Sequence, residues 1–300
     1  MSSKNLGHLR LIIFFTVIIY LLSFITPDTD LEILNINILQ FVLFYVWIVQ
    51  IIGFIFGFIY QTERYYDFIG SLTYSSSTLI IYFSLPAKSL TDSILLILVL
   101  IWSLRLGLFL FRRILEDGHD TRFDKPKQSF FHFLQYWTGQ AMWVSFTCIA
   151  VYVAMISQEN NALSTVSLIG LFIWVVGFVI EVVADSQKRN FRKDLNNKGR
   201  FISTGLWSRS RHPNYFGEIT LWVGISVISL SSLSGIGYVA LISPFFVYAL
   251  LSKGSGIPLL ERSADKKWGN ESDYQEYKKG TPVLFPKLFN NIKQSNDNGN

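Results

Sequence analysis

The sequence predicts an all-α, polytopic membrane protein, a bundle of about seven or eight transmembrane helices. Three observations predict this class. Half of the 300 residues are hydrophobic and only 16% are charged, whereas a soluble domain carries about a quarter charged residues. The apolar residues come in long blocks, and the basic residues gather between alternate blocks. The single cysteine, Cys148, excludes an intramolecular disulfide framework.

The apolar blocks are the predicted spans. A helix needs about 20 mostly apolar residues to cross a hydrocarbon core about 30 Å thick. The first block follows Lys4 and Arg10, and because no small-residue cleavage site comes after it, we expect a retained anchor rather than a signal peptide. Eight blocks approach the required length, at 11–26, 36–60, 67–86, 93–111, 133–157, 163–184, 214–233 and 236–252. The last two are so close together that they predict a tight helical hairpin.

The distribution of lysine and arginine predicts the orientation. With eight spans and a cytoplasmic N-terminus, the cytoplasmic segments hold 24 of the 26 basic residues. Only Lys88 falls outside, and Arg105 lies within a span. We therefore expect both termini in the cytoplasm, in an endoplasmic reticulum membrane or a bacterial inner membrane. The net charge of +5 then reflects topology and not nucleic-acid binding.

We expect one membrane domain with three parts. Residues 1–62 form N-terminal anchor spans, 63–288 form the domain that carries the chemistry, and the polar residues 289–300 form a disordered tail. The Gly53–Gly57 pair indicates close helix packing. The four histidines have no metal-ligand spacing, so no metal site is expected.

Three ionisable residues fall inside predicted spans: Arg105, Glu181 and Glu218. Because such residues are costly in a membrane, they indicate a functional site. Interior ion pairs, or end residues that reach the interface, are the structural alternative.

The segment EVVADSQKRNFRKD, residues 181–194, places Glu181, Asp185, Arg189 and Arg192 on one helical stripe. One interpretation is a helix end whose charges pair with each other. The other is a binding platform, in which Asp185 accepts hydrogen bonds from a ligand and Arg192 and its neighbours hold phosphate.

The segment GLWSRSRHPNYFGE, residues 205–218, concentrates polar chemistry where a span begins. Pro213 suits the first position of a helix, whose free N–H groups attract anions. Arg209 and Arg211 precede it, and arginine suits phosphate. Asn214 and Glu218 are four residues apart and share one helix face. A ligand with phosphates at the surface and a polar ring system further in would fit this array. A positive-inside loop followed by an acid at a helix N-terminus is the simpler alternative.

The C-terminal segment 254–287 is amphipathic, aromatic and basic. Glu261 comes soon after the last span, and Tyr274 and Tyr277 lie further on. This pattern fits either a plain surface helix or a lid over the cytoplasmic mouth, and we favour the lid.

These segments resemble the steroid 5-alpha-reductase superfamily of membrane reductases, in the branch known only as a domain of unknown function. The resemblance covers about residues 55–288, and the RHPNYFGE segment is its most specific part. The other segments that carry it are ERYYDFIGSLTY (63–74), WSLRLGLFLFRR (102–113), DSQKRNFR (185–192) and the tail from SGIPLLE to LFPK (255–287).

The resemblance implies reduction of a carbon–carbon double bond by NADPH, with the cofactor site at the cytoplasmic face. Asn214 and Glu218 match the family's Asn-x-x-Gly-Glu pattern and would contact the cofactor, and Asp185 and Arg192 match its aspartate and arginine. Arg105, in WSLRLG, would contact the cofactor or the substrate, judged from its position in this segment. The full cofactor-binding prediction is Arg105, Asp185, Arg189, Arg192, Arg209, Arg211, His212, Asn214, Glu218 and Glu261.

The implied substrate is a hydrophobic small molecule, lipid- or steroid-like, that enters from the bilayer. Relatives that reduce steroid enones polarise the ketone with an acid and a tyrosine in the N-terminal third. Glu63, Tyr66 and Asp67 are the candidates here, and Tyr215 is a further candidate proton donor.

Two other functions stay open. Membrane methyltransferases for isoprenylcysteine or phospholipids share a related RHPxYxG segment and use S-adenosylmethionine, but usually differ at Asn214 or Glu218. A lipid transporter or scaffold is the second alternative, although transporters often carry charged or broken helices in both halves.

Overall fold

The computed structural model describes residues 3–27, 29–157 and 163–287, and they are almost entirely helical. The predicted tail at 289–300 lies outside the described residues. The α-helices are α1 (Ser3–Leu22), α2 (Ile38–Ile59), α3 (Tyr66–Ser84), α4 (Leu90–Asp117), α5 (Phe130–Ser157), α6 (Thr165–Lys193), α7 (Pro213–Ser229), α8 (Ser243–Ala249), α9 (Ile257–Trp268) and α10 (Ser272–Gly280).

Shorter elements join these helices. Strands β1 (Glu32–Ile33) and β2 (Ile36–Asn37) form a small antiparallel hairpin. Its two turn residues, Leu34 and Asn35, have φ of 54° and 62°, as a two-residue primed turn requires. The 3₁₀ turns are η1 (Thr121–Phe123), η2 (Pro126–Gln128), η3 (Leu195–Asn197), η4 (Gly205–Ser208), η5 (Leu230–Ser232) and η6 (Gly235–Ile242), and η7 (Leu250–Gly254) is a π-helix.

The predicted all-α membrane bundle is confirmed. Among the described residues, seven helical stretches are long and apolar enough to cross a membrane: 3–22, 38–59, 90–117, 130–157, 165–193, 213–232 and 235–268. Of the eight predicted blocks, the one at 67–86 is not among them, although it forms α3.

The polar residues of α3 explain why it falls below the hydropathy of a span. Its hydroxyls bond inside the protein: Thr73 Oγ1 donates to Ile69 O at 2.6 Å, and Gln50 Nε2 of α2 donates to Thr73 Oγ1 at 2.8 Å. Ser71 Oγ donates to Ser103 O of α4 at 2.5 Å. Because α3 has 19 residues and rises about 1.5 Å per residue, it is long enough to be the eighth crossing helix.

The described chain divides into two compact units, which we describe separately. The first comprises residues 1–172 and 222–247, and the second comprises 173–221 and 248–300. Each unit is built from two separate stretches of the chain. The boundary expected between residues 62 and 63 stays a prediction.

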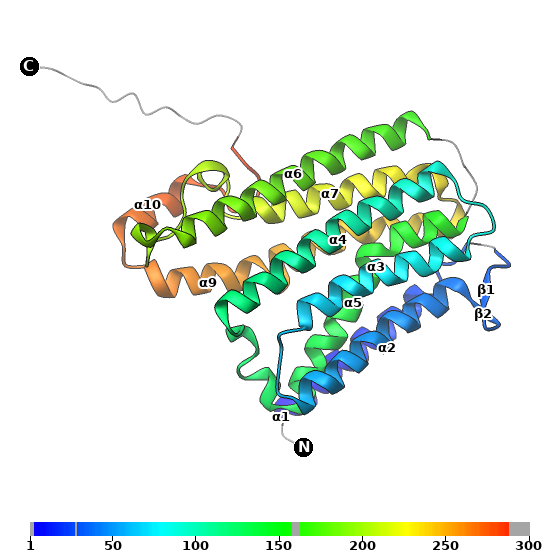
Figure 1. Cartoon of the computed structure of the whole chain (residues 1–300), viewed down its shortest axis with the longest axis horizontal. Helices are drawn as coiled ribbons and strands as arrows, with labels where there is room; N and C mark the ends of the chain where they lie inside the picture. Colours follow the sequence, from blue (N-terminus) through cyan, green and yellow to red (C-terminus); the bar gives the residue numbers. More distant parts are fainter. Residues whose placement is uncertain (1–2, 28, 158–162, 288–300) are drawn as a thin grey trace, which may run out of the picture. The chain divides into compact units, whose positions relative to one another are not determined.

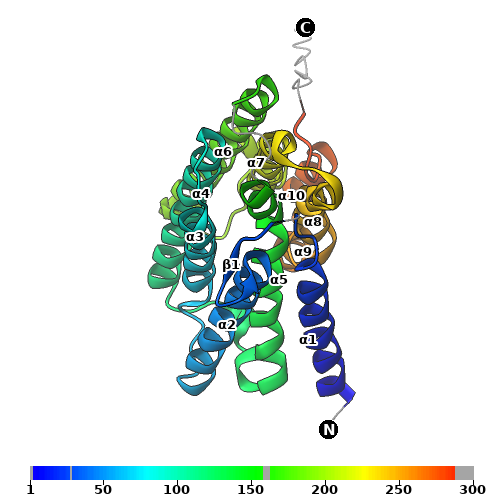
Figure 2. The ribbon, with the colours of Figure 1, turned by 90° about the vertical axis from the view of Figure 1, so that its right-hand side faces the viewer.

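In the first unit, α5 packs against α1, α2 and α3, and α3 packs against α4 (Figures 1 and 2). Aromatic residues fill the end of this core, where Phe54, Phe123, Phe133 and Trp137 form one buried cluster. The expected close packing at the Gly53–Gly57 pair is confirmed. A Cβ on Gly53 would lie 2.3 Å from the Trp137 ring, and one on Gly57 would lie 2.9 Å from Thr62 O.

In the second unit, α6 and α7 run antiparallel with their backbones in contact (Figure 1). A Cβ on Gly177 would lie 2.4 Å from Leu221 N, and a Cβ on Gly217 would lie 2.6 Å from Glu181 N. Glycine is the one residue that allows this approach. The contact holds the polar ends of the two helices together, and the candidate site is built there.

Candidate functional site

The site is built around the start of α7, which begins at Pro213 as predicted. Asn214 Nδ2 donates a long hydrogen bond, 3.3 Å, to Asp185 Oδ1 of α6. Asp185 and Glu218 are buried, at 7% and 8% exposed. The structure therefore brings Asp185 and Asn214 together, 29 residues apart in the chain.

The loop that precedes α7 is docked on α6. Trp207 is buried and its Nε1 donates to Ala184 O at 3.0 Å. Leu206 N donates to Gln187 Oε1 at 2.9 Å, and the Lys188 ammonium lies 4.5 Å from the Trp207 ring centroid. These contacts fix the loop that carries the two predicted arginines, Arg209 and Arg211.

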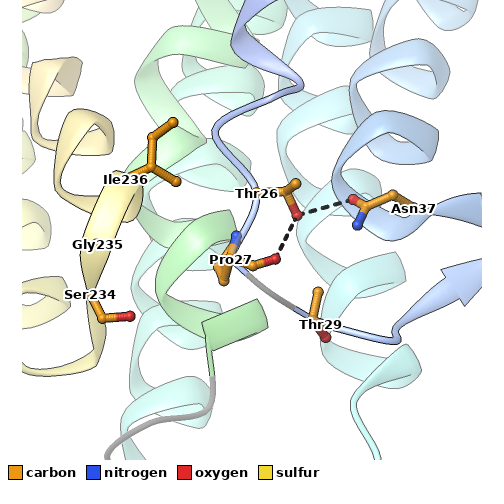
Figure 3. A pocket seen from close by; sticks show the side chains of 7 residues that line it. All are labelled: Thr26, Pro27, Thr29, Asn37, Ser234, Gly235 and Ile236. Carbon is orange, nitrogen blue, oxygen red and sulfur yellow. Dashed lines mark hydrogen bonds between the residues drawn. The ribbon is translucent and has the colours of Figure 1, made fainter.

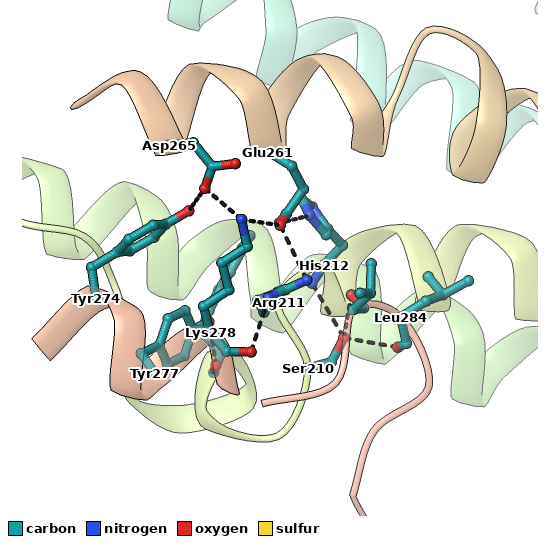
Figure 4. A network of polar contacts seen from close by, with 11 residues as sticks. Ser210, Arg211, His212, Glu261, Asp265, Tyr274, Tyr277, Lys278 and Leu284 are labelled. Atoms are coloured by element: carbon teal, nitrogen blue, oxygen red, sulfur yellow. Dashed lines mark hydrogen bonds and ion pairs between the residues drawn. The ribbon is translucent and has the colours of Figure 1, made fainter. Parts of the chain in front are cut away.

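Three of the predicted cofactor-binding residues contact each other in one network (Figure 4). Glu261 of α9 pairs with Arg211, whose Nη2 lies 3.1 Å from Glu261 Oε2, and with His212, whose Nε2 lies 2.8 Å from Glu261 Oε1. Lys278 of α10 approaches the same carboxylate at 3.9 Å and pairs with Asp265 at 2.5 Å. Arg211 and His212 are thus engaged by the protein's own carboxylate.

His212 is a hydrogen-bond donor in this network. Burial lowers its pKa and outweighs the opposing effect of Glu261, so the imidazole is neutral at pH 7. A neutral imidazole that contacts a carboxylate through Nε2 carries its hydrogen there. The ring also stacks on Tyr215, with centroids 5.7 Å apart and planes 13° apart, so the position of Tyr215 depends on this network.

The C-terminal segment packs against the arginine-rich loop, and the lid over the cytoplasmic mouth stays a prediction. Arg211 Nη1 donates to Lys278 O at 3.0 Å, and Arg211 N donates to Pro282 O at 2.9 Å. Ser210 Oγ donates to Leu284 O at 2.8 Å, and Tyr277 Oη donates to Trp207 O at 2.7 Å. Ser210 and Lys278 were not among the predicted site residues, because a serine between two arginines carries no sequence signal that it holds the tail.

Two predicted arginines differ from Arg211 in their surroundings. Arg192, in the last turn of α6, and Arg209, after η4, are exposed. Within the described part of the chain, neither guanidinium has a carboxylate partner. Arg189 is half-buried on α6 and takes part in other interactions. Arg192 and Arg209 are therefore the cations available to an anionic ligand.

The remaining predicted residues belong to the first unit. Glu63 is buried and accepts hydrogen bonds from Lys127 Nζ at 2.9 Å and Asp120 N at 3.1 Å. Burial alone would raise the pKa of Glu63, but these two donors lower it below its ordinary value. Tyr66 Oη donates to Tyr136 O at 2.9 Å. Both groups already have protein partners.

Asp67 and Arg105 complete the predicted set. Asp67 pairs with Arg122 at 3.6 Å and with Arg113 at 3.7 Å. The Arg105 guanidinium lies 5.3 Å from the centroid of Phe109 on α4.

One hollow of the first unit carries none of the predicted residues (Figure 3). It has a volume of about 500 Å³ and lies between the α1–α2 connection and the start of η6. Thr26 Oγ1 and Asn37 Oδ1 on its wall lie 3.2 Å apart in a hydrogen bond. Nowhere in residues 3–27, 29–157 and 163–287 do three metal-binding side chains gather.

The fold and the buried polar helix ends define a polytopic membrane protein with a polar site at one end of its helices. The sequence model of a family described as "Protein of unknown function (DUF1295)" matches residues 53–281. The chain belongs to this family. Relatives named as steroid reductases confirm the expected resemblance to the steroid 5-alpha-reductase superfamily.

Three relatives show the range of names. The chain is 29% identical over 119 residues to 3-oxo-5-alpha-steroid 4-dehydrogenase 1 of Rattus norvegicus, which covers 40% of each chain. It is 30% identical over 123 residues to steroid 5-alpha-reductase DET2 of Gossypium hirsutum, covering 41% of this chain and 42% of that one. It is 32% identical over 123 residues to probable O-methyltransferase ustE of Ustilaginoidea virens, covering 41% of each.

These similarities are partial. The chain spans about two fifths of the length of the curated relatives it matches. No solved structure matches it significantly.

Proposed function

We propose that this protein is an integral membrane oxidoreductase that uses NADPH to reduce a carbon–carbon double bond of a lipid- or steroid-like substrate. One observation carries the proposal. Within the second unit, exposed and unpaired Arg192 and Arg209 lie on the segments that lead to the pair of buried Asp185 and half-buried Asn214. The names of the steroid reductases among the relatives support the same reading.

The residues present fit NADPH. The cofactor carries three phosphate groups, which need cations, and a carboxamide, which needs a donor and an acceptor. Arg192 and Arg209 supply the cations, and Asn214 with Asp185 supplies the donor and acceptor. Arg211 adds a further donor, since its Nε is buried and has no hydrogen-bond partner among the described residues. The exposed guanidinium groups of Arg192 and Arg209 can each place two parallel N–H groups on one phosphate.

In the proposed mechanism the chain binds, orients and excludes water. When bound, NADPH supplies the hydride. Arg192 and Arg209 hold the phosphates at the surface. Asp185 and Asn214 orient the carboxamide end of the cofactor. Glu218, one helical turn below Asn214, accepts a hydrogen bond from that carboxamide. The apolar helices keep water away from the electron-poor carbon of the substrate.

Three residues are candidates for the proton donor: Tyr215, Glu63 and Tyr66. Glu63 is ionised and held by Lys127, so it would first have to take up a proton. The hydroxyl of Tyr66 would have to leave the Tyr136 carbonyl. Tyr215 is placed by its stacking on His212, next to Asn214. We keep Tyr215, Glu63 and Tyr66 as candidates and assign Tyr215 first.

A methyltransferase is the second candidate, because one relative is named as an O-methyltransferase. Its cofactor would be S-adenosylmethionine, which carries no phosphate. Exposed, unpaired arginines at both ends of the 192–209 stretch would then have no ligand group to hold. This chemistry favours the dinucleotide.

The test of the function is cofactor binding followed by product analysis. The full chain, purified in detergent, is expected to bind NADPH with a rise in nicotinamide fluorescence and to bind S-adenosylmethionine at least about tenfold more weakly. Incubation with NADPH and a panel of unsaturated steroids, sterols and fatty-acyl enones should give a product heavier by two hydrogens. Binding of S-adenosylmethionine alone would support the methyltransferase, and binding of neither would support a transporter or scaffold.

Arg192→Ala is expected to weaken NADPH binding about tenfold and to leave NADH binding nearly unchanged. The reason is the loss of one charge-assisted contact to the 2′-phosphate, worth about 1.5 kcal/mol. Arg262→Ala, which removes an exposed arginine of α9, is the matched control. Fluorescence titrations with both cofactors measure the ratio, and equal losses for the two cofactors would remove the 2′-phosphate assignment.

A further inference from the structure

The connection between α4 and α5 is an ordered segment with short helical turns. It folds into η1 and η2, and Phe123 is buried in the aromatic cluster of the first unit. Arg122 holds Asp120 through its Nε and Nη2, the latter at 2.6 Å. Burial would raise the pKa of Asp120, but Arg122 lowers it below its ordinary value. The connection is therefore fixed by a stable ion pair and by a buried ring.

This connection and the first turns of α5 line an open hollow of about 320 Å³. Its wall carries Arg122, Lys125, Asp124, His132 and Tyr136. Arg122 is already paired with Asp120. Lys125 is exposed, and no carboxylate of the described residues pairs with it. The Tyr136 hydroxyl likewise has no hydrogen-bond partner in the described part of the chain.

The hollow lies where two membrane spans begin. His132, in the first turn of α5, stacks on His8 of α1 with ring centroids 4.2 Å apart. His8 Nδ1 also lies 2.6 Å from Gln135 Oε1 of α5. Both α1 and α5 are candidate spans that start at this end. We expect a polar hollow at the end of two candidate spans to lie at the depth of the lipid headgroups.

We infer that this hollow binds the phosphate of a phospholipid headgroup. Lys125 supplies the charge and Tyr136 donates a hydrogen bond, while Arg122, held by Asp120, fixes the shape of the wall. The acyl chains would lie along exposed apolar side chains of α1, such as Phe14. A lysine at the membrane surface attracts anionic headgroups. The lipid is thus held independently of the site on α6 and α7.

Native mass spectrometry of the full chain in detergent tests this inference. The probes are phosphatidylglycerol, diacylglycerol with the same acyl chains, and inorganic phosphate. Phosphatidylglycerol is expected to bind about fivefold more tightly than diacylglycerol, the effect of one cation near an anionic headgroup. Inorganic phosphate at the same concentration should not displace it. Equal binding of diacylglycerol, or full displacement by inorganic phosphate, would overturn the lipid assignment.

Variants locate the binding. Lys125→Ala and Tyr136→Phe should each reduce phosphatidylglycerol affinity severalfold, while Lys125→Arg keeps it. Lys253→Ala is the matched control, since Lys253 is also exposed and lies on η7. The Lys125 side chain makes no hydrogen bond or ion pair within the described residues, and the backbone hydrogen bond from Gln128 N to Lys125 O does not need that side chain. The variant should therefore stay folded, and a normal unfolding midpoint checks this. If Lys125→Ala and Lys253→Ala bind the lipid equally well, the hollow is not the site.

Discussion

Protein carrying Glu218→Gln is expected to bind NADPH about 100-fold more weakly than the natural chain. Glu218 is buried on α7, one helical turn below Asn214, and glutamine keeps its size while removing its charge. A hydrogen bond to a charged group contributes about 1.5–3 kcal/mol, and each 1.4 kcal/mol is a factor of ten in affinity. The loss should appear in the nicotinamide fluorescence titration.

Asn214→Ala tests the second residue of α7 that is proposed to contact the carboxamide end of NADPH. It removes the amide that bonds Asp185 at 3.3 Å and should weaken NADPH binding at least tenfold. The unfolding midpoint in detergent should stay close to that of the natural chain, because this hydrogen bond is long and Asn214 is only half-buried.

Matched controls separate the site from general effects of charge and amide loss. Glu271→Gln changes an exposed glutamate, and Asn190→Ala changes an exposed asparagine on α6. Both should bind NADPH normally. Tight NADPH binding by Glu218→Gln and Asn214→Ala together would show that the proposed roles of α7 are wrong.

The sequence predicted the helices and the start of α7 because local signals determine them. Apolar block length identifies a span, and Pro213 suits only the first turn of a helix. Helical spacing also placed Asn214 and Glu218 on one face. The confirmed packing at Gly53 and Gly57 has the same origin, since small residues one turn apart let a neighbouring helix approach.

The sequence could not show which arginines are free, because pairing depends on contacts between distant segments. Arg209 and Arg211 are two residues apart and look equivalent. In the structure Arg211 is held by Glu261, 50 positions along the chain, while Arg209 is exposed. Likewise the hydrophobicity of α3 alone could not reveal that its hydroxyls are satisfied by Gln50 and by its own carbonyls.

Gly217→Ala is expected to lower the unfolding midpoint in detergent by about 5 °C or more, although it adds one methyl group. The added Cβ would lie 2.6 Å from Glu181 N and 2.7 Å from Gly177 O. Both neighbours are backbone atoms, so relief requires α6 and α7 to move apart. Overpacking of this kind costs about 1–3 kcal/mol or more, and each 1 kcal/mol moves the midpoint of a chain this size by a few degrees.

The same substitution at Gly7 is the control, because nothing lies within 4 Å of a Cβ there. Gly7→Ala should leave the midpoint unchanged or raise it slightly, since alanine favours a helix interior. Gly217 lies between Asn214 and Glu218 in the sequence, so Gly217→Ala should also weaken NADPH binding. In this variant the weaker binding should accompany a lower unfolding midpoint. Glu218→Gln adds no atom to the α6–α7 backbone contact, so it should lose binding without the clash that Gly217→Ala introduces. An unchanged midpoint for Gly217→Ala would mean that α6 and α7 do not approach as closely as their glycines indicate.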